Sequence, residues 1–258
     1  MAKKTKKRVS DKVLIVMPYY PKGAQGRELE FAIAGWRKHF KEDFLLAIVG
    51  EGLPTIEGKD VVCIESERVG LPQRPNLYRP HLDYVKCFRK VHKLYPEYKG
   101  FVFTADDNYL VNDCTLADIQ TLKINQPEFN GYKDSFNLWE VDMWKTRKLL
   151  DSEGYPHRNF TTHVPQYYEW DKLIALYDKY DMDNESYVFE NLYFNIYNSD
   201  DEAILLNNET DNIRFGAWHN DFRHEDLCKA FKTKQWIVNS PSGYTYDLAN
   251  QLAKHYGL

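Results

Sequence analysis

Two adjacent acids, Asp106 and Asp107, follow the apolar segment 100–104 with one alanine between. A short, continuous apolar run is typical of a buried parallel strand, and ligands of open α/β sheets bind where such strands end. Neighbouring carboxylates repel each other unless a cation is present, and a hard divalent ion shared with a substrate diphosphate is a natural partner. The pair therefore predicts a metal site, and the alternative is a solvated turn at the end of the strand.

The segments around this pair predict the elements that position it. Apolar runs at 13–17, 44–49 and 60–64 indicate three further strands, and helical spacing of apolar residues indicates helices over 27–40 and 82–94. This β-α-β-α-β order favours a mostly parallel sheet with right-handed crossovers. Thr115 and Asp118 have the spacing of a capping box, and helical patterns continue near 141–154, 170–180 and 188–197, whereas the segment from 213 onward is expected to mix aromatic residues with loops.

Composition excludes several classes of protein. With 43% apolar and 28% charged residues, a largely disordered chain is excluded. The net charge is −4, but five cations lie within residues 1–8, which leaves −9 on the rest and disfavours a surface for duplex nucleic acid. Residues 1–10 are expected to be a disordered basic tail and 11–258 a single domain, with a nucleotide-binding half over 11–125 and an acceptor-side half over 126–258.

Features that the sequence lacks bear on the cellular location of the protein and on other enzyme classes. No apolar run approaches the ~20 residues that span a bilayer and no apolar segment follows the N-terminal lysines, so a cytoplasmic protein with four reduced cysteines is expected. The motifs of serine hydrolases, zinc peptidases and dinucleotide-binding proteins are also missing from it.

Candidate residues for a nucleotide ligand lie before the acid pair. Tyr19 and Tyr20 end the first expected strand and could stack on a base such as uracil. Phosphates could be contacted by Arg27, which opens the first expected helix, and by Arg79 and Lys86, which bracket the start of the second. Arg79 and Lys86 could equally be solvated helix residues.

The segment Phe101–Ile119 resembles the DxD region of GT-A-fold glycosyltransferases, and is similar in particular to bacterial polysaccharide-synthesis and Stealth-type transferases. The resemblance implies an α/β, GT-A-like (Rossmann-type) fold, with a mostly parallel sheet flanked by helices and a more helical C-terminal acceptor half. It also implies that Asp107 binds Mn²⁺ or Mg²⁺ while Asp106 faces the ribose, or the reverse. The sequence here is Ala105-Asp-Asp-Asn108, which departs from a strict DxD motif.

The resemblance extends to three later residues. Glu190 lies in a segment similar to an acidic helix start of GT-A enzymes, which implies a general base, with Asp183 and Glu185 as alternatives. His163 lies in a Thr-His-x-Pro element that such transferases share, and it could contact phosphate or acceptor. His219 is implied as a further metal ligand, with His224 as its rival.

These features predict a metal-dependent glycosyltransferase of the hexosyltransferase type. It would move a sugar from a nucleoside-diphosphate sugar, with a UDP-sugar favoured, to a hydroxyl of a glycan or another acceptor; a nucleic-acid acceptor is not favoured. One alternative keeps the same site in a Stealth-like hexose-1-phosphate transferase that releases UMP. Another alternative is a catalytically silent module that binds a nucleotide sugar.

Overall fold

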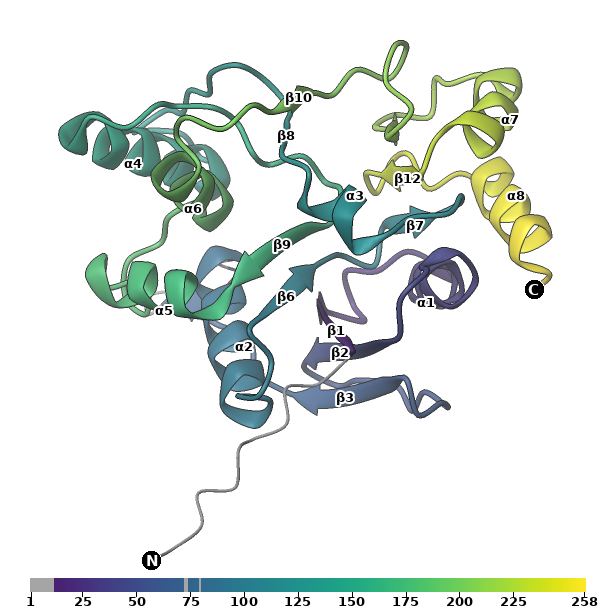
Figure 1. Cartoon of the computed structure of the whole chain (residues 1–258), viewed down its shortest axis with the longest axis horizontal. Helices are drawn as coiled ribbons and strands as arrows, with labels where there is room; N and C mark the ends of the chain where they lie inside the picture. Colours follow the sequence, from purple (N-terminus) through teal and green to yellow (C-terminus); the bar gives the residue numbers. More distant parts are fainter. Residues whose placement is uncertain (1–11, 72–73, 79) are drawn as a thin grey trace, which may run out of the picture.

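A five-stranded sheet forms the centre of the computed structural model, which describes residues 12–71, 74–78 and 80–258 (Figure 1). Its strand order is β3-β2-β1-β6-β9. The first four strands along that order are parallel, and β9 joins the edge antiparallel to β6. Their bounds are β1 Val13–Tyr19, β2 Phe44–Gly50, β3 Val61–Glu65, β6 Gly100–Phe103 and β9 Gln166–Glu169. The prediction of a mostly parallel α/β sheet is therefore confirmed.

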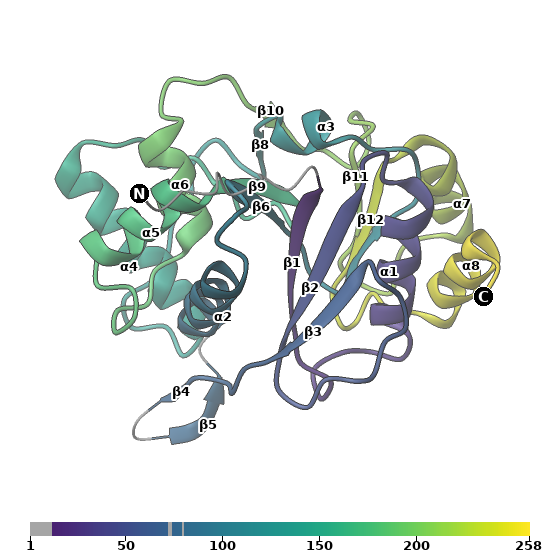
Figure 2. The same cartoon turned by 60° about the horizontal axis from the view of Figure 1, so that its bottom comes forward.

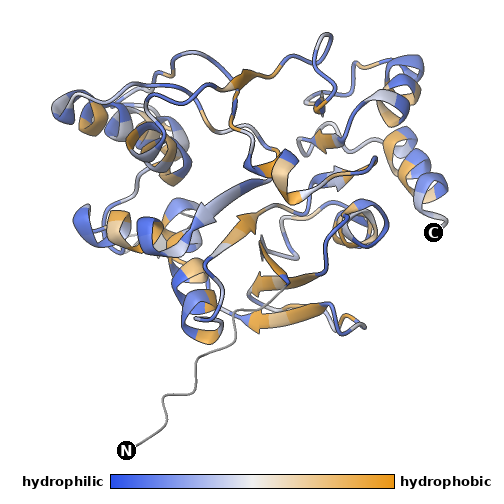
Figure 3. Ribbon diagram, viewed as in Figure 1, coloured by the Kyte–Doolittle hydropathy of each residue, from blue (hydrophilic) through white to orange (hydrophobic). Residues whose placement is uncertain are grey.

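The central strands are buried on both faces because alternate side chains enter two separate cores. In β1, Ile15 and Met17 join one apolar cluster, whereas Leu14 and Val16 join the other. Successive side chains of a strand point to opposite faces, so a continuous apolar run is what two covered faces require. Figure 3 shows hydrophobic residues concentrated along these strands.

Two groups of helices cover the two faces (Figure 2). One face carries α1 (Glu28–His39), with α7 (His224–Thr233) and α8 (Tyr246–Tyr256) farther out. The other carries α2 (Pro80–Leu94), α4 (Leu138–Glu153), α5 (Trp170–Lys179) and α6 (Phe189–Tyr197). Every helix within the described residues is too short or too polar to cross a bilayer.

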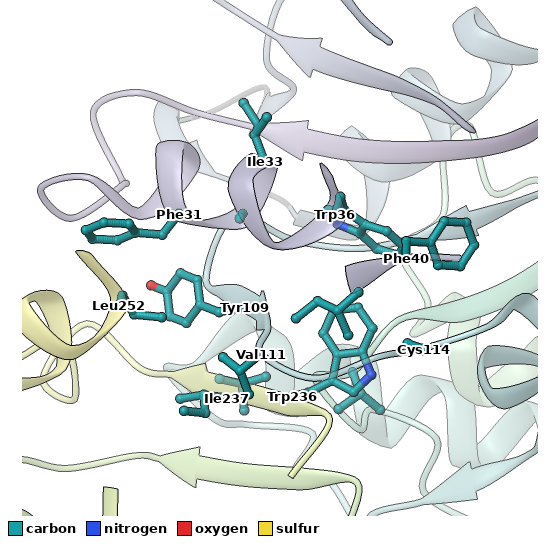
Figure 4. Packing of buried hydrophobic residues seen from close by; sticks show 14 of the residues in the cluster. Phe31, Ile33, Trp36, Phe40, Tyr109, Val111, Cys114, Trp236, Ile237 and Leu252 are labelled. Carbon is teal, nitrogen blue, oxygen red and sulfur yellow. The ribbon is translucent and has the colours of Figure 1, made fainter. Parts of the chain in front are cut away.

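A second, three-stranded sheet packs against α1. It runs β11 (Arg214–Ala217), β12 (Trp236–Asn239) and β7 (Asn108–Leu110), with β11 parallel and β7 antiparallel to β12. Trp36 of α1 lies 5.3 Å from Trp236 between ring centroids, and Tyr109 lies in the same cluster (Figure 4). Because β6 ends in the first sheet and β7 begins in the second, residues 104–107 cross between the two sheets.

The remaining elements are short. They are α3 (Leu116–Gln120), the parallel pair β8 (Lys123–Ile124) and β10 (Ile204–Leu205), and the hairpin of β4 (Gly70–Leu71) and β5 (Arg74–Tyr78). The capping box expected at Thr115 is confirmed, because its side chain accepts from the Asp118 backbone while Asp118 accepts from the Thr115 backbone. Gly154 ends α4 in the left-handed conformation.

Two expectations need comment. The expectation that 213 onward consists of aromatic residues and loops is wrong, since β11, α7, β12 and α8 lie there. β11 combines Arg214 and Gly216 with two apolar residues, so it shows no continuous apolar run. The helices α7 and α8 do carry buried apolar residues at helical spacing, which could have revealed them. The expected basic tail over 1–10, and the candidate Arg79, lie outside the residues that the structure describes.

Candidate functional site

Asp106 and Asp107 lie at the carboxyl end of β6, where the chain crosses between the two sheets. The Thr104 backbone N–H donates to the Val16 oxygen of β1 in the first sheet, and the Asp107 backbone oxygen accepts from the Asn239 N–H of β12 in the second. β1 is parallel to β6, so Tyr19 at its end reaches the same edge. The sequence-based placement of the acids at the end of a buried strand is therefore correct.

Two cavities meet at this edge. The first, here named the Tyr19 cavity, has a volume of about 440 Å³, and its lining includes Tyr19, Tyr20, Glu28, Arg68, Asp106 and Asp107. The second, named the Glu190 cavity, has a volume of about 280 Å³, and its lining includes His81, Trp139, His163, Glu190 and Asp107. Asp107, Tyr84 and Ala105 line both cavities, so the two spaces adjoin at the second acid.

Three carboxyl groups crowd the Tyr19 cavity. Burial and the nearby Glu28 raise the pKa of Asp106 to about 7. Burial, followed by the charges of Asp106 and Glu28, raises the pKa of Asp107 well above its usual range. Burial also raises the pKa of Glu28, although its carboxylate accepts hydrogen bonds from the Gln25 backbone and from Asn239. No ion pair to either aspartate exists among the described residues, so the cluster favours binding of protons or of a cation.

The donor set suits a hard divalent cation that arrives with phosphate oxygens. Mg²⁺ is usually held by one or two protein carboxylates together with substrate phosphates, and Asp106 and Asp107 supply two. Over the described parts of the chain, no three His, Cys, Asp or Glu side chains converge to form a site by themselves. The residues therefore fit a shared metal site and do not form a closed protein cage.

His219 does not complete this site. Its side chain is exposed, it lines neither cavity, and no three-ligand group within the described residues includes it. The ring of the preceding Trp218 lies 5.0 Å from that of His163, between ring centroids. The structure therefore does not bring His219 together with Asp106 and Asp107, and a role for His219 as a metal ligand stays a prediction.

Two expected phosphate contacts lie elsewhere. Arg27 binds Glu30 and lines a separate cavity of about 790 Å³ beside α1, and Lys86 donates to the backbone oxygen of Glu67. The cation that lines the Tyr19 cavity is Arg68, whose guanidinium carbon lies 3.5 Å from the ring centroid of Tyr20. Arg68 follows β3, so the rule that places ligands beyond the carboxyl ends of parallel strands could have found it.

Glu190 lies in the first turn of α6 and lines the Glu190 cavity. Burial raises the pKa of this carboxyl to about 7. Its Oε2 is buried and has no hydrogen-bond partner in the described structure. A carboxyl group with these properties can exchange a proton near neutral pH. The alternatives Asp183 and Glu185 are instead exposed and bind Arg89 and Lys145.

His163 reaches the same cavity from a strained loop. Its φ is 57°, the left-handed region that a residue with a side chain rarely adopts, and such strain often occurs at functional sites. Arg214 of β11 supports the loop by donating from Nη1 to the Thr162 oxygen at 2.5 Å. Although much of its side chain is open to the cavity, the surrounding protein atoms, together with the charge of Arg214, lower the pKa of His163 to about 4. The imidazole is therefore neutral near neutral pH.

Replacing Arg214 with glutamine tests this electrostatic link. We expect the pKa of His163 to rise toward the ordinary value near 6.5, because the variant removes a positive charge and loosens the protein around the ring. An NMR pH titration of the imidazole signals would measure it, with His163→Gln identifying the resonance. Arg223→Gln, at an exposed position, is the matched control. An unchanged His163 pKa in the Arg214 variant would contradict the link.

Comparisons with known proteins gave only structural similarities. No family model matches the chain, and no curated protein matches it. The fold is similar to that of a glycosyltransferase involved in the glycosylation of the major capsid of PBCV-1, with 12% identity and a TM-score of 0.43, covering 96% of this chain and 100% of that one. It is also similar to two structures of the glycosyltransferase GlyE from Streptococcus pneumoniae TIGR4, with identities of 10% and 12% and TM-scores of 0.40 and 0.42. The matches cover 96% of this chain but only 60% and 61% of those two chains. These similarities are distant.

Proposed function

We propose that this protein is a metal-dependent glycosyltransferase that moves a sugar from a nucleoside-diphosphate sugar to an acceptor hydroxyl. The observation that carries the proposal is the junction of the two cavities at Asp107. One cavity offers aromatic rings, a guanidinium and two acids, which suits a base and a diphosphate. The other offers a carboxyl group with a raised pKa, which suits a hydroxyl that must lose its proton.

Each residue then has a defined task. Tyr19 and Tyr20 would border the nucleoside, with Arg68 beside Tyr20 placed to contact phosphate oxygens. Asp106 and Asp107 would hold Mn²⁺ or Mg²⁺ together with the diphosphate, and the bound ion would neutralise charge on the departing nucleotide. With Asp107 at the junction, the sugar would lie between the two cavities.

Glu190 would act on the acceptor. In its ionised form it would accept the proton of the attacking hydroxyl, and its buried Oε2 has no competing donor among the described residues. The neutral His163 could hydrogen-bond to the acceptor or to phosphate without adding a charge. The acceptor side is small, at about 280 Å³, and fits one sugar-sized group.

A thermal-shift screen of nucleotide sugars with and without Mn²⁺ tests the proposal. A ligand that binds only the folded state raises Tm by mass action. At a free ligand concentration of one hundred times Kd, the free energy of unfolding increases by about 2.7 kcal/mol. We expect a UDP-sugar to raise Tm with Mn²⁺ present and EDTA to abolish the increase. An increase of Tm that is the same with and without EDTA would contradict the proposed metal dependence.

The product nucleotide separates the remaining alternatives. Release of UDP supports glycosyl transfer, whereas release of UMP would assign the site to transfer of a sugar phosphate. Binding of a donor without any product, across a panel of glycan and small hydroxyl acceptors, would indicate a silent binding module.

A further inference from the structure

A second cluster of reactive side chains joins helices α7 and α8, away from both cavities. His224 Nδ1 lies 2.8 Å from one carboxylate oxygen of Asp247 and 3.0 Å from the other. On the far side of the same ring, His224 Nε2 lies 3.2 Å from the Sγ of Cys228. The three groups therefore form a line of acid, imidazole and thiol.

Helices α7 and α8 alone bring these three side chains together. His224 and Cys228 are four residues apart on α7, so they share one face of the helix. Asp247 lies in the first turn of α8, where the Thr245 side chain caps the helix. Because Asp247 holds Nδ1 on one side of the ring, the Nε2 on the other side faces the thiol and can accept its proton. This is the arrangement of nucleophile, base and orienting acid that activates a sulfur atom.

The other three cysteines have no such partner among the described residues. Burial raises the pKa of the Cys87 and Cys114 thiols to about 12. Cys63 is more exposed than Cys228, but its thiol donates to the Pro54 oxygen, and burial of the sulfur together with Glu65 raises its pKa. Cys63 is therefore the more exposed cysteine, whereas Cys228 is the one with an imidazole beside its thiol.

We propose that Cys228 is a thiol-modification site for low-molecular-weight disulfides, activated by His224 that Asp247 orients. The Cys228 sulfur attacks one sulfur of the reagent, a new S–S bond forms, and the old S–S bond breaks. His224 takes the thiol proton and returns it to the departing thiolate, so one disulfide and one thiol give one mixed disulfide and one thiol. None of the three residues lines any of the five cavities of about 280–790 Å³ described for residues 12–71, 74–78 and 80–258, which fits a small reagent from solution better than a bound ester or peptide.

Competition between two accessible thiols tests the site. The full-length protein is treated with glutathione disulfide or with 5,5′-dithiobis(2-nitrobenzoate) at pH 7, and mass spectrometry of peptides follows Cys228 and Cys63 separately. We expect Cys228 to react at least about tenfold faster than Cys63, although Cys63 is the more exposed. Cys228→Ser should remove the fast phase. A Cys63 rate equal to or above the Cys228 rate would overturn the proposal.

Two variants separate activation from exposure. His224→Gln should slow Cys228 about tenfold and leave Cys63 unchanged, and Asp247→Asn should produce a smaller loss, because the imidazole remains but loses its fixed orientation. Both positions are partly exposed, with 59% and 39% of their side chains accessible, so the fold should tolerate the changes, and circular dichroism would check it. A Cys228 rate in His224→Gln within twofold of the unmodified protein would also overturn the proposal.

Discussion

Replacing Asp107 with asparagine is expected to lower sugar transfer by at least about 10²–10³-fold, the scale for losing one group that stabilises charge in a transition state. Asp107 is the acid that lines both cavities, so it is closest to where the bond to the leaving nucleotide would break. Asparagine keeps the shape of the side chain but has no charge to hold a cation. Without that charge, the growing negative charge on the diphosphate is left uncompensated.

The stability of the same variant distinguishes this loss from unfolding. Burial and the charges of Asp106 and Glu28 already raise the pKa of Asp107, so a neutral side chain should leave the protein at least as stable. Initial rates with saturating Mn²⁺ and the Mn²⁺-dependent increase of Tm with donor should both fall, while the Tm of the free protein does not. Asp200→Asn, at an exposed position, is the matched control. Turnover like that of the unmodified protein, with the same metal dependence, would contradict the metal role of Asp107.

The variant Asp106→Asn distinguishes which of the two acids binds the metal and which contacts the ribose. If Asp106 faces the ribose, its variant should mainly raise the KM for the donor and keep the metal dependence. If the order is reversed, Asp106→Asn should show the larger loss of kcat and of metal response. The two variants compared under the same conditions therefore assign the ligand.

Local signals in the sequence were sufficient for the first half of the fold. Continuous apolar runs identified β1, β2 and β6, because central strands covered on both faces have little room for polar residues. The run 60–64 also identified the edge strand β3, although Cys63 and Glu65 of that strand are exposed. The same parallel order located Asp106 and Asp107 at the ligand-binding edge, since the carboxyl ends of parallel strands lie together. These inferences needed only the chain near each element.

The contacts that complete the site depend on residues far apart in the sequence. Asn239 donates to Glu28 across 211 positions, and it also accepts from Tyr109 of β7. No local pattern distinguishes Glu28 from a surface glutamate or Asn239 from an asparagine in a turn, because the residue types are the same. His219 was suggested by the family resemblance alone, and its side chain is exposed and lines neither cavity.

Replacing Glu190 with glutamine is expected to lower kcat by about 10²–10⁴-fold, the usual contribution of a general base. Glutamine fills the same space and cannot accept a proton from the acceptor hydroxyl. The rate of the unmodified protein should rise with pH through about 7, where Glu190 becomes ionised, and the variant should lose that limb of the profile. Glu185→Gln, which removes an exposed carboxylate on the same side of the fold, should leave the rate unchanged within about twofold. A change below about threefold in Glu190→Gln would assign Glu190 to a structural role.

The stability of Glu190→Gln should change in the opposite direction to its activity. The folded-state pKa of Glu190 is about 7 and its ordinary value is 4.5, so the folded protein binds this proton more tightly than the unfolded chain. Its stabilising effect is present at low pH and is lost as the pH rises through 7, which amounts to about 3 kcal/mol at pH 8. Glutamine avoids that loss, so the variant should be more stable by up to this amount at pH 8 and by less than about 1 kcal/mol at pH 5. Urea unfolding at the two pH values measures the difference. A variant that is inactive yet more stable at pH 8 is what a catalytic carboxyl predicts, whereas a carboxyl kept only for packing would give a variant that is less stable at both pH values.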